Sequence, residues 1–262
     1  MRKRRAFLTI ATVSVALAAA TGGLFAYSAS GDEPEKQDLA AETEAAEDTP
    51  PPEPPSTEVA KPTAEHDCGE VGEYQEEVET TLAAQAEYGT IFIDGKQSKE
   101  DCAAIKKFQK DMGISPAEGY AGEVTRDIAK RIAGSDFAGC EAGKGITVCV
   151  DLTHQTLWVV KDGERVMEPT VVRTGMAGYA TTPGTWKIYD RADTHWSRPY
   201  KVWLPYWQNF NAGQGLHETT TYLHDSFGSH GCVNLLPSDA EKLYEMLGNG
   251  DTIEVFGKRP GT

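Results

Sequence analysis

The chain of 262 residues is long enough for one or two domains, and its 39% hydrophobic residues are ordinary for a protein with a buried core. Lys and Arg number 25 against 40 for Asp and Glu, which gives a net charge of -15. Because nucleic-acid phosphates are bound by an excess of basic residues, this balance argues against a nucleic-acid partner.

Residues 1–30 have the pattern of an export signal. A basic start precedes an uncharged stretch at 6–27 and then small residues, so we expect the chain outside the cytoplasm. Arg4 and Arg5 open a short match to a twin-arginine signal, and that route and the general export route both stay open. The uncharged stretch is also long enough to span a bilayer, so a cleaved signal and a retained membrane anchor are both compatible with it.

Residues 31–67 predict a disordered tether. They contain almost no large apolar residues, many acidic side chains and a proline cluster at 50–55. Such a segment cannot bury enough apolar surface to fold, and charge repulsion together with proline stiffness keeps it extended. We expect this acidic linker to hold the folded part of the chain away from the signal or anchor.

Residues 68–139 predict a small all-α domain of three helices. Apolar residues recur at helical spacing in three segments: Tyr74, Val78 and Leu82; Cys102, Ile105, Phe108 and Met112; and Val124, Ile128 and Ile132. Ser98 is placed as the N-cap of the second helix, and Gly113 can close it.

The stretch 103–129 resembles the second half of a peptidoglycan-binding domain. In that domain a helix ending in a Phe-Gln pair, here Phe108 and Gln109, is followed by a glycine-punctuated loop and another helix. The resemblance implies that the domain contacts glycan. A structural spacer, in which Phe108 is simply a core residue, remains the alternative.

From residue 140 the sequence pattern changes to that of strands. Apolar residues alternate through 146–152, and Asp162-Gly163 is a strong hairpin turn. Later, Ser238 and Glu241 have capping-box spacing at the start of one clear helix, and a closing strand follows near 251–256. Residues 140–262 therefore predict a mainly β domain.

Four of the five cysteines are candidates for disulfides, because an exported protein with an even set plus one suggests two bridges and a free thiol. Four cysteines allow three pairings. We favour Cys68 with Cys102, inside the helical domain, and Cys140 with Cys149 at the first strand.

The fifth cysteine, Cys232, lies close to histidines at 217, 224 and 230. A thiol with an ordinary pKa near 8.5 is mostly protonated at neutral pH, and it needs an imidazole or a backbone dipole to become a nucleophile. Gly231 leaves room for a substrate carbonyl, and successive N–H groups there can form an oxyanion hole. The segment therefore predicts a nucleophilic thiol.

Two other interpretations of Cys232 stay open. A zinc site is one, although His-Gly-Cys places two ligands closer than the usual zinc spacings, and the sequence contains no CxxC or HExxH. A buried, inert cysteine is the other. His66, His154 and His195 stand alone and are interpreted as surface or loop residues. No metal or cofactor is expected.

Residues 140–256 resemble the catalytic domain of L,D-transpeptidases, the YkuD-type fold. The family motif is a histidine, a variable spacer, Ser or Thr, His-Gly-Cys, a hydrophobic residue, and Asn or Arg. Here it is His217, an eleven-residue spacer and "SHGCVN", Ser229 to Asn234. Three supporting segments follow in the family's order, "VCVDLTHQTLWVVKDGERV", "TVVRTGMAGYATTPGTWKIYD" and "YWQNFNAGQGLHE", with Thr182 where the family has proline.

The resemblance implies a β-sandwich with a mixed sheet and an active site under a loop. It implies that His217, oriented by the main chain at Glu218, takes the proton from Cys232. The thiolate would attack the third residue of a peptidoglycan tetrapeptide, release D-alanine and form a thioester, and an amine of a neighbouring stem would complete a 3→3 cross-link. His224 lies inside the spacer and remains the alternative base.

The resemblance also implies roles for residues near the nucleophile. Ser229 and His230 would shape the site, and Asn234 would brace its loop. Backbone N–H groups around Gly231 are the candidate oxyanion donors. Three aromatic residues either wall a substrate groove or pack in the core: Tyr206, Trp207 and Phe210.

Three functions follow as alternatives. The first is a peptidoglycan L,D-transpeptidase, the second an L,D-carboxypeptidase with water as acceptor, and the third a non-catalytic wall-binding protein. The expected partners are peptidoglycan stem peptides and glycan. We expect a monomer without a cofactor, secreted or membrane-anchored in the cell wall of a Gram-positive bacterium.

Overall fold

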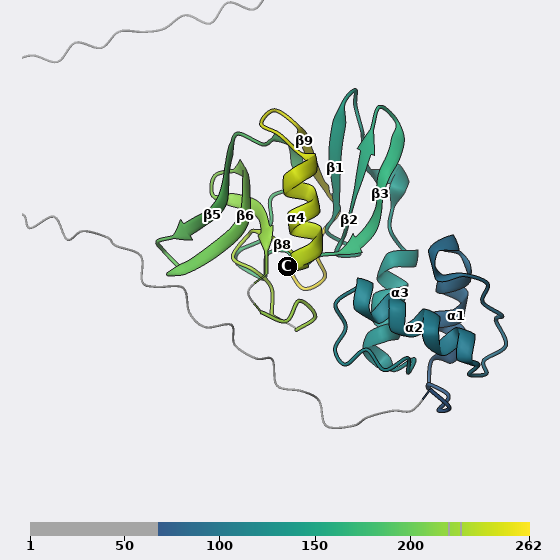
Figure 1. Ribbon diagram of the computed structural model, residues 1–262. Coiled ribbons are helices and arrows are strands. Elements are labelled where there is room, and N and C mark those ends of the chain that lie inside the picture. Colours follow the sequence, from purple (N-terminus) through teal and green to yellow (C-terminus); the bar gives the residue numbers. More distant parts are fainter. Residues whose placement is uncertain (1–67, 220, 226) are drawn as a thin grey trace, which may run out of the picture. The chain divides into compact units, whose positions relative to one another are not determined.

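The computed structural model describes residues 68–219, 221–225 and 227–262 (Figure 1). The predicted export signal and tether, residues 1–67, lie outside these residues. Among the residues that are described, no helix combines the length and the apolar character that crossing a bilayer requires.

The helical region, residues 68–139, contains three α-helices: α1 (Gln75–Ala83), α2 (Lys99–Asp111) and α3 (Glu123–Ala133). Ser98 caps α2, as the sequence predicted. Its side chain accepts a hydrogen bond from the Asp101 N–H, and the Asp101 carboxylate accepts one from the Ser98 N–H in return.

The apolar sides of these helices meet in one cluster that includes Val78, Phe108 and Ile128. Val124, which the apolar spacing placed among the core residues, is instead 45% exposed. The buried side of α3 passes through Thr125, the next residue, because adjacent helical positions are rotated far apart around the axis.

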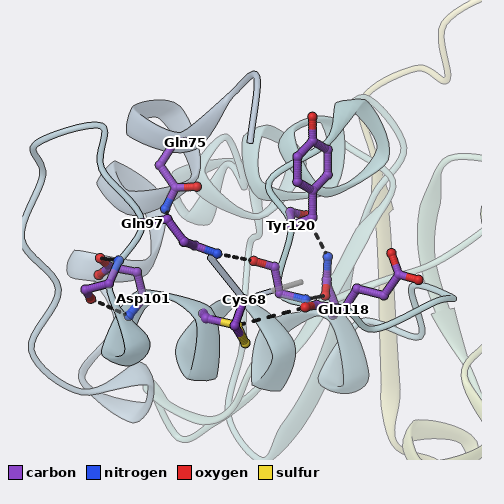
Figure 2. Close-up of a disulfide and its surroundings, with 10 residues drawn as sticks. Cys68, Gln75, Gln97, Asp101, Glu118 and Tyr120 are labelled. Carbon is purple, nitrogen blue, oxygen red and sulfur yellow. Dashed lines mark hydrogen bonds between the residues drawn. A yellow bond between two sulfur atoms is a disulfide. The ribbon is translucent and has the colours of Figure 1, made fainter. Parts of the chain in front are cut away.

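Both predicted disulfides are present. Cys68 is bonded to Cys102 on α2, and Cys140 to Cys149 on the first strand, while Cys232 is free. Beside the first disulfide, Gln75 donates to Gln97, which donates to the Gly119 carbonyl (Figure 2). The disulfide and these amide side chains thus tie the start of the helical region and the loop after α2 to the helices.

The β domain consists of two mixed sheets. The first has the strand order β3-β2-β1-β9-β4, in which β1 and β9 are parallel; the second has the order β5-β6-β7-β8, in which β7 and β8 are parallel (Figure 1). The strands are β1 (Ile146–Asp151), β2 (Thr156–Lys161), β3 (Glu164–Val171), β4 (Gly184–Lys187), β5 (Asp190–Ser197), β6 (Val202–Asn211), β7 (Gln214–Glu218), β8 (Val233–Leu235) and β9 (Thr252–Phe256).

One apolar core receives side chains from both sheets and from α4 (Pro237–Met246). The predicted Asp162-Gly163 hairpin turn connects β2 and β3. The predicted capping box at Ser238 and Glu241 is wrong. The N-cap is Leu236, two residues before Ser238, and the helix begins at Pro237, because proline lacks an N–H and its fixed φ suits the first helical position.

Arg131 on α3 joins the helical region to the β domain. Its guanidinium donates to the carbonyls of His154, Gln155 and Val172, at 3.0, 2.6 and 2.9 Å. Burial lowers the pKa of Arg131 to about 10. A buried guanidinium that is bonded to three carbonyls from one partner specifies a single docking arrangement, since each carbonyl fixes one direction.

Candidate active site

The parallel pair of β7 and β8 positions the predicted base and nucleophile. Leu216 is opposite Val233, and His217 is opposite Asn234. Leu216 and Val233 point into the apolar core, so the alternating neighbours point to the other face of the sheet. Cys232 directly precedes β8 and therefore comes out on the face that carries His217.

His217 is buried, at 5% exposure, and one of its nitrogens is fixed. Its Nδ1 lies 2.7 Å from the Glu218 carbonyl oxygen. Because a carbonyl oxygen only accepts, Nδ1 carries the hydrogen and Nε2 keeps a free lone pair. Burial, with a smaller contribution from the charge of Arg173, lowers the pKa of His217 to about 4, so the ring is neutral at physiological pH.

Cys232 has a thiol that is protonated at rest. Its Sγ lies 3.7 Å from the Gly213 carbonyl oxygen. Burial raises the pKa of the thiol, and a main-chain hydrogen bond from Gly215 opposes this rise in part. A neutral imidazole on the same face of the sheet as a protonated thiol suits proton transfer during attack, not a preformed ion pair.

A tight turn carries Cys232. The Ser229 hydroxyl donates to the Cys232 carbonyl at 2.5 Å and accepts from the Gly231 N–H at 3.1 Å. Thr181 donates to the Gly231 carbonyl at 2.8 Å. Gly231 has a φ of +112°, a backbone angle that residues other than glycine rarely adopt, so glycine is required here.

This turn corrects one expectation. The Gly231 N–H is already bonded to Ser229, so it is not a free oxyanion donor. The N–H groups of His230 and Cys232 are then the remaining candidates in the motif. The sequence places the three amides in a row, but only the fold shows that one of them builds the turn.

His224, the alternative base, lies elsewhere. Its Nε2 is 2.6 Å from the Met112 carbonyl, to which it must donate, and Met112 belongs to the helical region. Burial lowers the pKa of His224 to about 4 as well. Nε2, which is free in His217, is therefore already used as a hydrogen-bond donor in His224.

Comparison with known proteins places the chain in a family. A family model of the L,D-transpeptidase catalytic domain, YkuD, matches residues 145–255. A crystal structure of an L,D-transpeptidase from Stackebrandtia nassauensis has 74% sequence identity and a TM-score of 0.73, and the match covers 78% of this chain and 100% of that one. The chain belongs to the L,D-transpeptidase family.

Two further matches are more distant. An L,D-transpeptidase from Mycobacterium smegmatis is 22% identical over 44% of this chain and 60% of that one, with a TM-score of 0.39. A C442S mutant of the Enterococcus faecium L,D-transpeptidase is 26% identical over 44% and 50%, with a TM-score of 0.38. No curated protein sequence matches the chain.

The aromatic residues that the sequence offered as a groove wall lie mostly inside the transpeptidase domain. Phe210 is 2% exposed and belongs to the core, and Trp207 is 3% exposed. Trp207 stacks on His195 with ring centroids 4.9 Å apart and lies 6.1 Å from His217. Tyr206 packs on Tyr244. Phe210 and Trp207 are therefore buried packing residues. His195 stacks on Trp207, the ring that lies next to His217.

Exposed rings gather at His230 instead. The His230 ring stacks on Tyr200 at 4.3 Å and meets Tyr179 edge-on at 4.7 Å. Both tyrosines are about half exposed. Sequence reasoning missed them because Tyr200 lies in the β5–β6 turn and Tyr179 in a loop, and no local pattern connects either residue to the motif.

Arg173 is a second residue that sequence reasoning missed. Its main chain pairs with that of Asn234 in both directions, at 3.0 and 2.9 Å. Its buried guanidinium donates to the Tyr222 carbonyl at 2.9 Å and to the Asp225 carboxylate at 2.8 Å. Asn234 is thus held through its main chain, and its side-chain oxygen is buried without a partner among the described residues.

Metal ligands do not gather in the part of the chain that the structure describes: no three His, Cys, Asp or Glu side chains there are placed to hold an ion.

Proposed function

We propose that this L,D-transpeptidase forms 3→3 cross-links in peptidoglycan through a thioester on Cys232. The observation that carries the proposal is the hydrogen bond from His217 Nδ1 to the Glu218 carbonyl, which leaves Nε2 as the free base on the face that Cys232 shares. Two neutral partners, a lone pair and a thiol, are ready for proton transfer.

The proposed reaction has two halves. In the first, His217 Nε2 takes the thiol proton while Cys232 Sγ attacks the carbonyl of the third stem residue. The tetrahedral intermediate collapses, and the imidazolium returns its proton to the departing D-alanine amine, which leaves a thioester. N–H groups of His230 and Cys232 would stabilise the oxyanion. In the second half, a side-chain amine of a neighbouring stem attacks the thioester, His217 takes the amine proton, and the thiol is restored.

The proposal also places the protein outside the cytoplasm. Two disulfides support this, because such bonds form and persist in oxidising compartments. Whether the protein is secreted or membrane-anchored depends on residues 1–67, which lie outside the described part of the chain. Fractionation of cells, with detection of the N-terminus, separates a cleaved signal from a retained anchor.

We further propose that the helical region contacts the cell wall, as its resemblance to a peptidoglycan-binding domain implies. A cavity of about 320 Å³, lined by Gln109, Tyr120 and Val124 among others, has both hydrogen-bonding and apolar walls. A Val124→Asp variant should reduce co-sedimentation with insoluble peptidoglycan. Val166→Asp, at a residue of β3 that is equally exposed, should leave it unchanged.

The reaction is tested with a disaccharide-tetrapeptide and mass analysis of the products. The full chain should yield a cross-linked dimer, and the Cys232→Ala variant should yield none. Formation of tripeptide alone would show that water is the acceptor, and it would identify an L,D-carboxypeptidase. An unchanged tetrapeptide, with a protein shown to be folded and to have a reduced Cys232, would overturn both enzymatic functions.

A further inference from the structure

The chain between the base and the nucleophile is held by the helical region. We call residues 221–225 the strap. Leu223 is buried within the apolar cluster of the helical region. His224, its neighbour, donates to the Met112 carbonyl directly after α2. The strap therefore reaches out of the β domain, and its apolar and its polar anchor both lie on the helical region.

The helical region also contacts the chain on the other side of the nucleophile. Leu236 directly follows β8 and lies in the same apolar cluster as Leu223. Gly113, next to Met112, approaches it so closely that a Cβ on Gly113 would lie 2.4 Å from a Leu236 methyl. The two contacts flank Cys232, nine residues before it and four residues after it.

Arg173 connects these two anchors inside the β domain. Its guanidinium donates to three groups of the strap: the Thr221 hydroxyl at 2.8 Å, the Tyr222 carbonyl and the Asp225 carboxylate. Its main chain pairs with Asn234 on β8. A displaced strap would leave a buried guanidinium without acceptors, which is costly, so strap and β8 keep one arrangement together.

We propose that the helical region is a positioning element of the active site: by anchoring the strap at Leu223 and His224, and the end of β8 at Leu236, it holds the Ser229–Cys232 turn against β7. His224 and Gly113 are positioning residues, and neither belongs to the pair of reacting side chains. The proposal goes beyond wall attachment. The test by kcat rests on the proposed transpeptidase function, while the test by amide hydrogen exchange does not.

The first test inserts a methyl group from the helical side. Gly113→Ala places the Cβ against Leu236, whereas Gly89→Ala is the matched control, because Gly89 has a similarly positive φ and nothing within 4 Å of its Cβ. In the full chain, kcat for the tetrapeptide should fall about 10- to 100-fold in Gly113→Ala with little change in KM, since a small misplacement of reacting groups has that effect. Gly89→Ala should stay within about 3-fold of the native kcat, given the same scale.

The second test removes the polar anchor. His224→Ala should lower kcat about tenfold, and His224→Gln, whose amide can donate to the Met112 carbonyl, should restore most of it. Restoration by the conservative variant distinguishes a positioning hydrogen bond from a structural role of the imidazole ring itself.

Amide hydrogen exchange provides the readout that needs no substrate. In Gly113→Ala and His224→Ala, exchange at residues 231–234 should accelerate together with exchange in the strap, while β1 and β2 stay protected. If the native protein does not act on the tetrapeptide, the proposed function fails and exchange still decides the positioning proposal. Acceleration confined to the strap, or native kcat and exchange in Gly113→Ala, would overturn it.

Discussion

The sheet that carries the nucleophile and the strap that docks on the helical region each contain one histidine with a lowered pKa. His217 and His224 have the same side chain and the same lowered pKa of about 4, and each donates to a main-chain carbonyl, although His217 is buried and His224 is partly exposed. They differ in which nitrogen donates. His217 uses Nδ1 and keeps Nε2 free, whereas His224 uses Nε2 and serves as an anchor. The roles of these two histidines are thus decided by which nitrogen meets a main-chain acceptor, not by their pKa values.

The largest expected effect comes from one substitution made at both histidines. Glutamine can replace a hydrogen-bond donor but not a base, so His217→Gln should lower kcat by about 10²- to 10⁴-fold, the usual contribution of a general base. His224→Gln should stay within about 3-fold of native, because the amide keeps the anchor to Met112. Product release from the tetrapeptide measures both rates. Equal losses of kcat in the two variants would show that the two histidines do not differ in role as base and anchor.

A smaller effect is expected where the turn meets β7. Ser229→Ala removes the acceptor of the Gly231 N–H and the donor to the Cys232 carbonyl, which leaves buried polar groups unpaired. Such a loss costs about 1 to 3 kcal/mol. We expect kcat to fall about tenfold, because about 1.4 kcal/mol of lost alignment corresponds to that factor. Ser238→Ala on α4 is the control and should leave kcat unchanged; a Ser229→Ala enzyme with native kcat would show that this turn does not align the nucleophile.

The two histidines should be equal in their effect on stability. Each has a folded pKa of about 4 and an unfolded pKa near 6.5, so between these values only the unfolded chain binds the proton. Stability is therefore lost as the pH falls from about 6.5 to about 4, by up to about 3 kcal/mol per histidine. Denaturant unfolding at pH 7 and pH 4.5 measures this loss. His217→Gln and His224→Gln should each reduce it by a similar amount, and a loss that is unchanged in either variant would contradict the assignment of that histidine.

The smallest effect concerns the thiol. Burial raises the pKa of Cys232, and His217 is neutral above pH 5, so it places no positive charge near the sulfur. The rate of alkylation by iodoacetamide should therefore rise with an apparent pKa above the ordinary value of about 8.5. His217→Gln should move that pKa by less than about 1 unit, since it removes no charge at that pH. An apparent pKa below 7 in the native protein would indicate a preformed ion pair instead.

The candidate site could be located from the sequence because its signals are local. The three residues His230, Gly231 and Cys232 are adjacent, and the odd cysteine count left one thiol unpaired. The disulfides followed from the same count and from assigning one pair to each domain, and the hairpin at Asp162-Gly163 followed from turn chemistry. The motif, the Cys140–Cys149 disulfide and the hairpin each involve residues that are close in the sequence, whereas Cys68 and Cys102 are 34 residues apart.

Other residues were out of reach for the same reason. Thr181 and Gly231 are 50 residues apart, and Arg173 and Asp225 are 52 apart, yet each pair shares a hydrogen bond. No local pattern indicates that Tyr200 in a turn stacks on His230. Trp207 and Phe210 are three residues apart on β6, a spacing that regular strand alternation places on opposite faces, and only the structure showed that both are buried.

By itself, then, the sequence predicted a thiol nucleophile at Cys232, the two disulfides, the change from helices to strands at residue 140 and the family. Which histidine has a free nitrogen, which amide is still available as a donor and how the helical region holds the strap were decided only by the tertiary structure. The physical reason is that a hydrogen bond is directional and each donor is used once. The sequence says which donors and acceptors are present, but only the fold determines which of them already take part in a hydrogen bond.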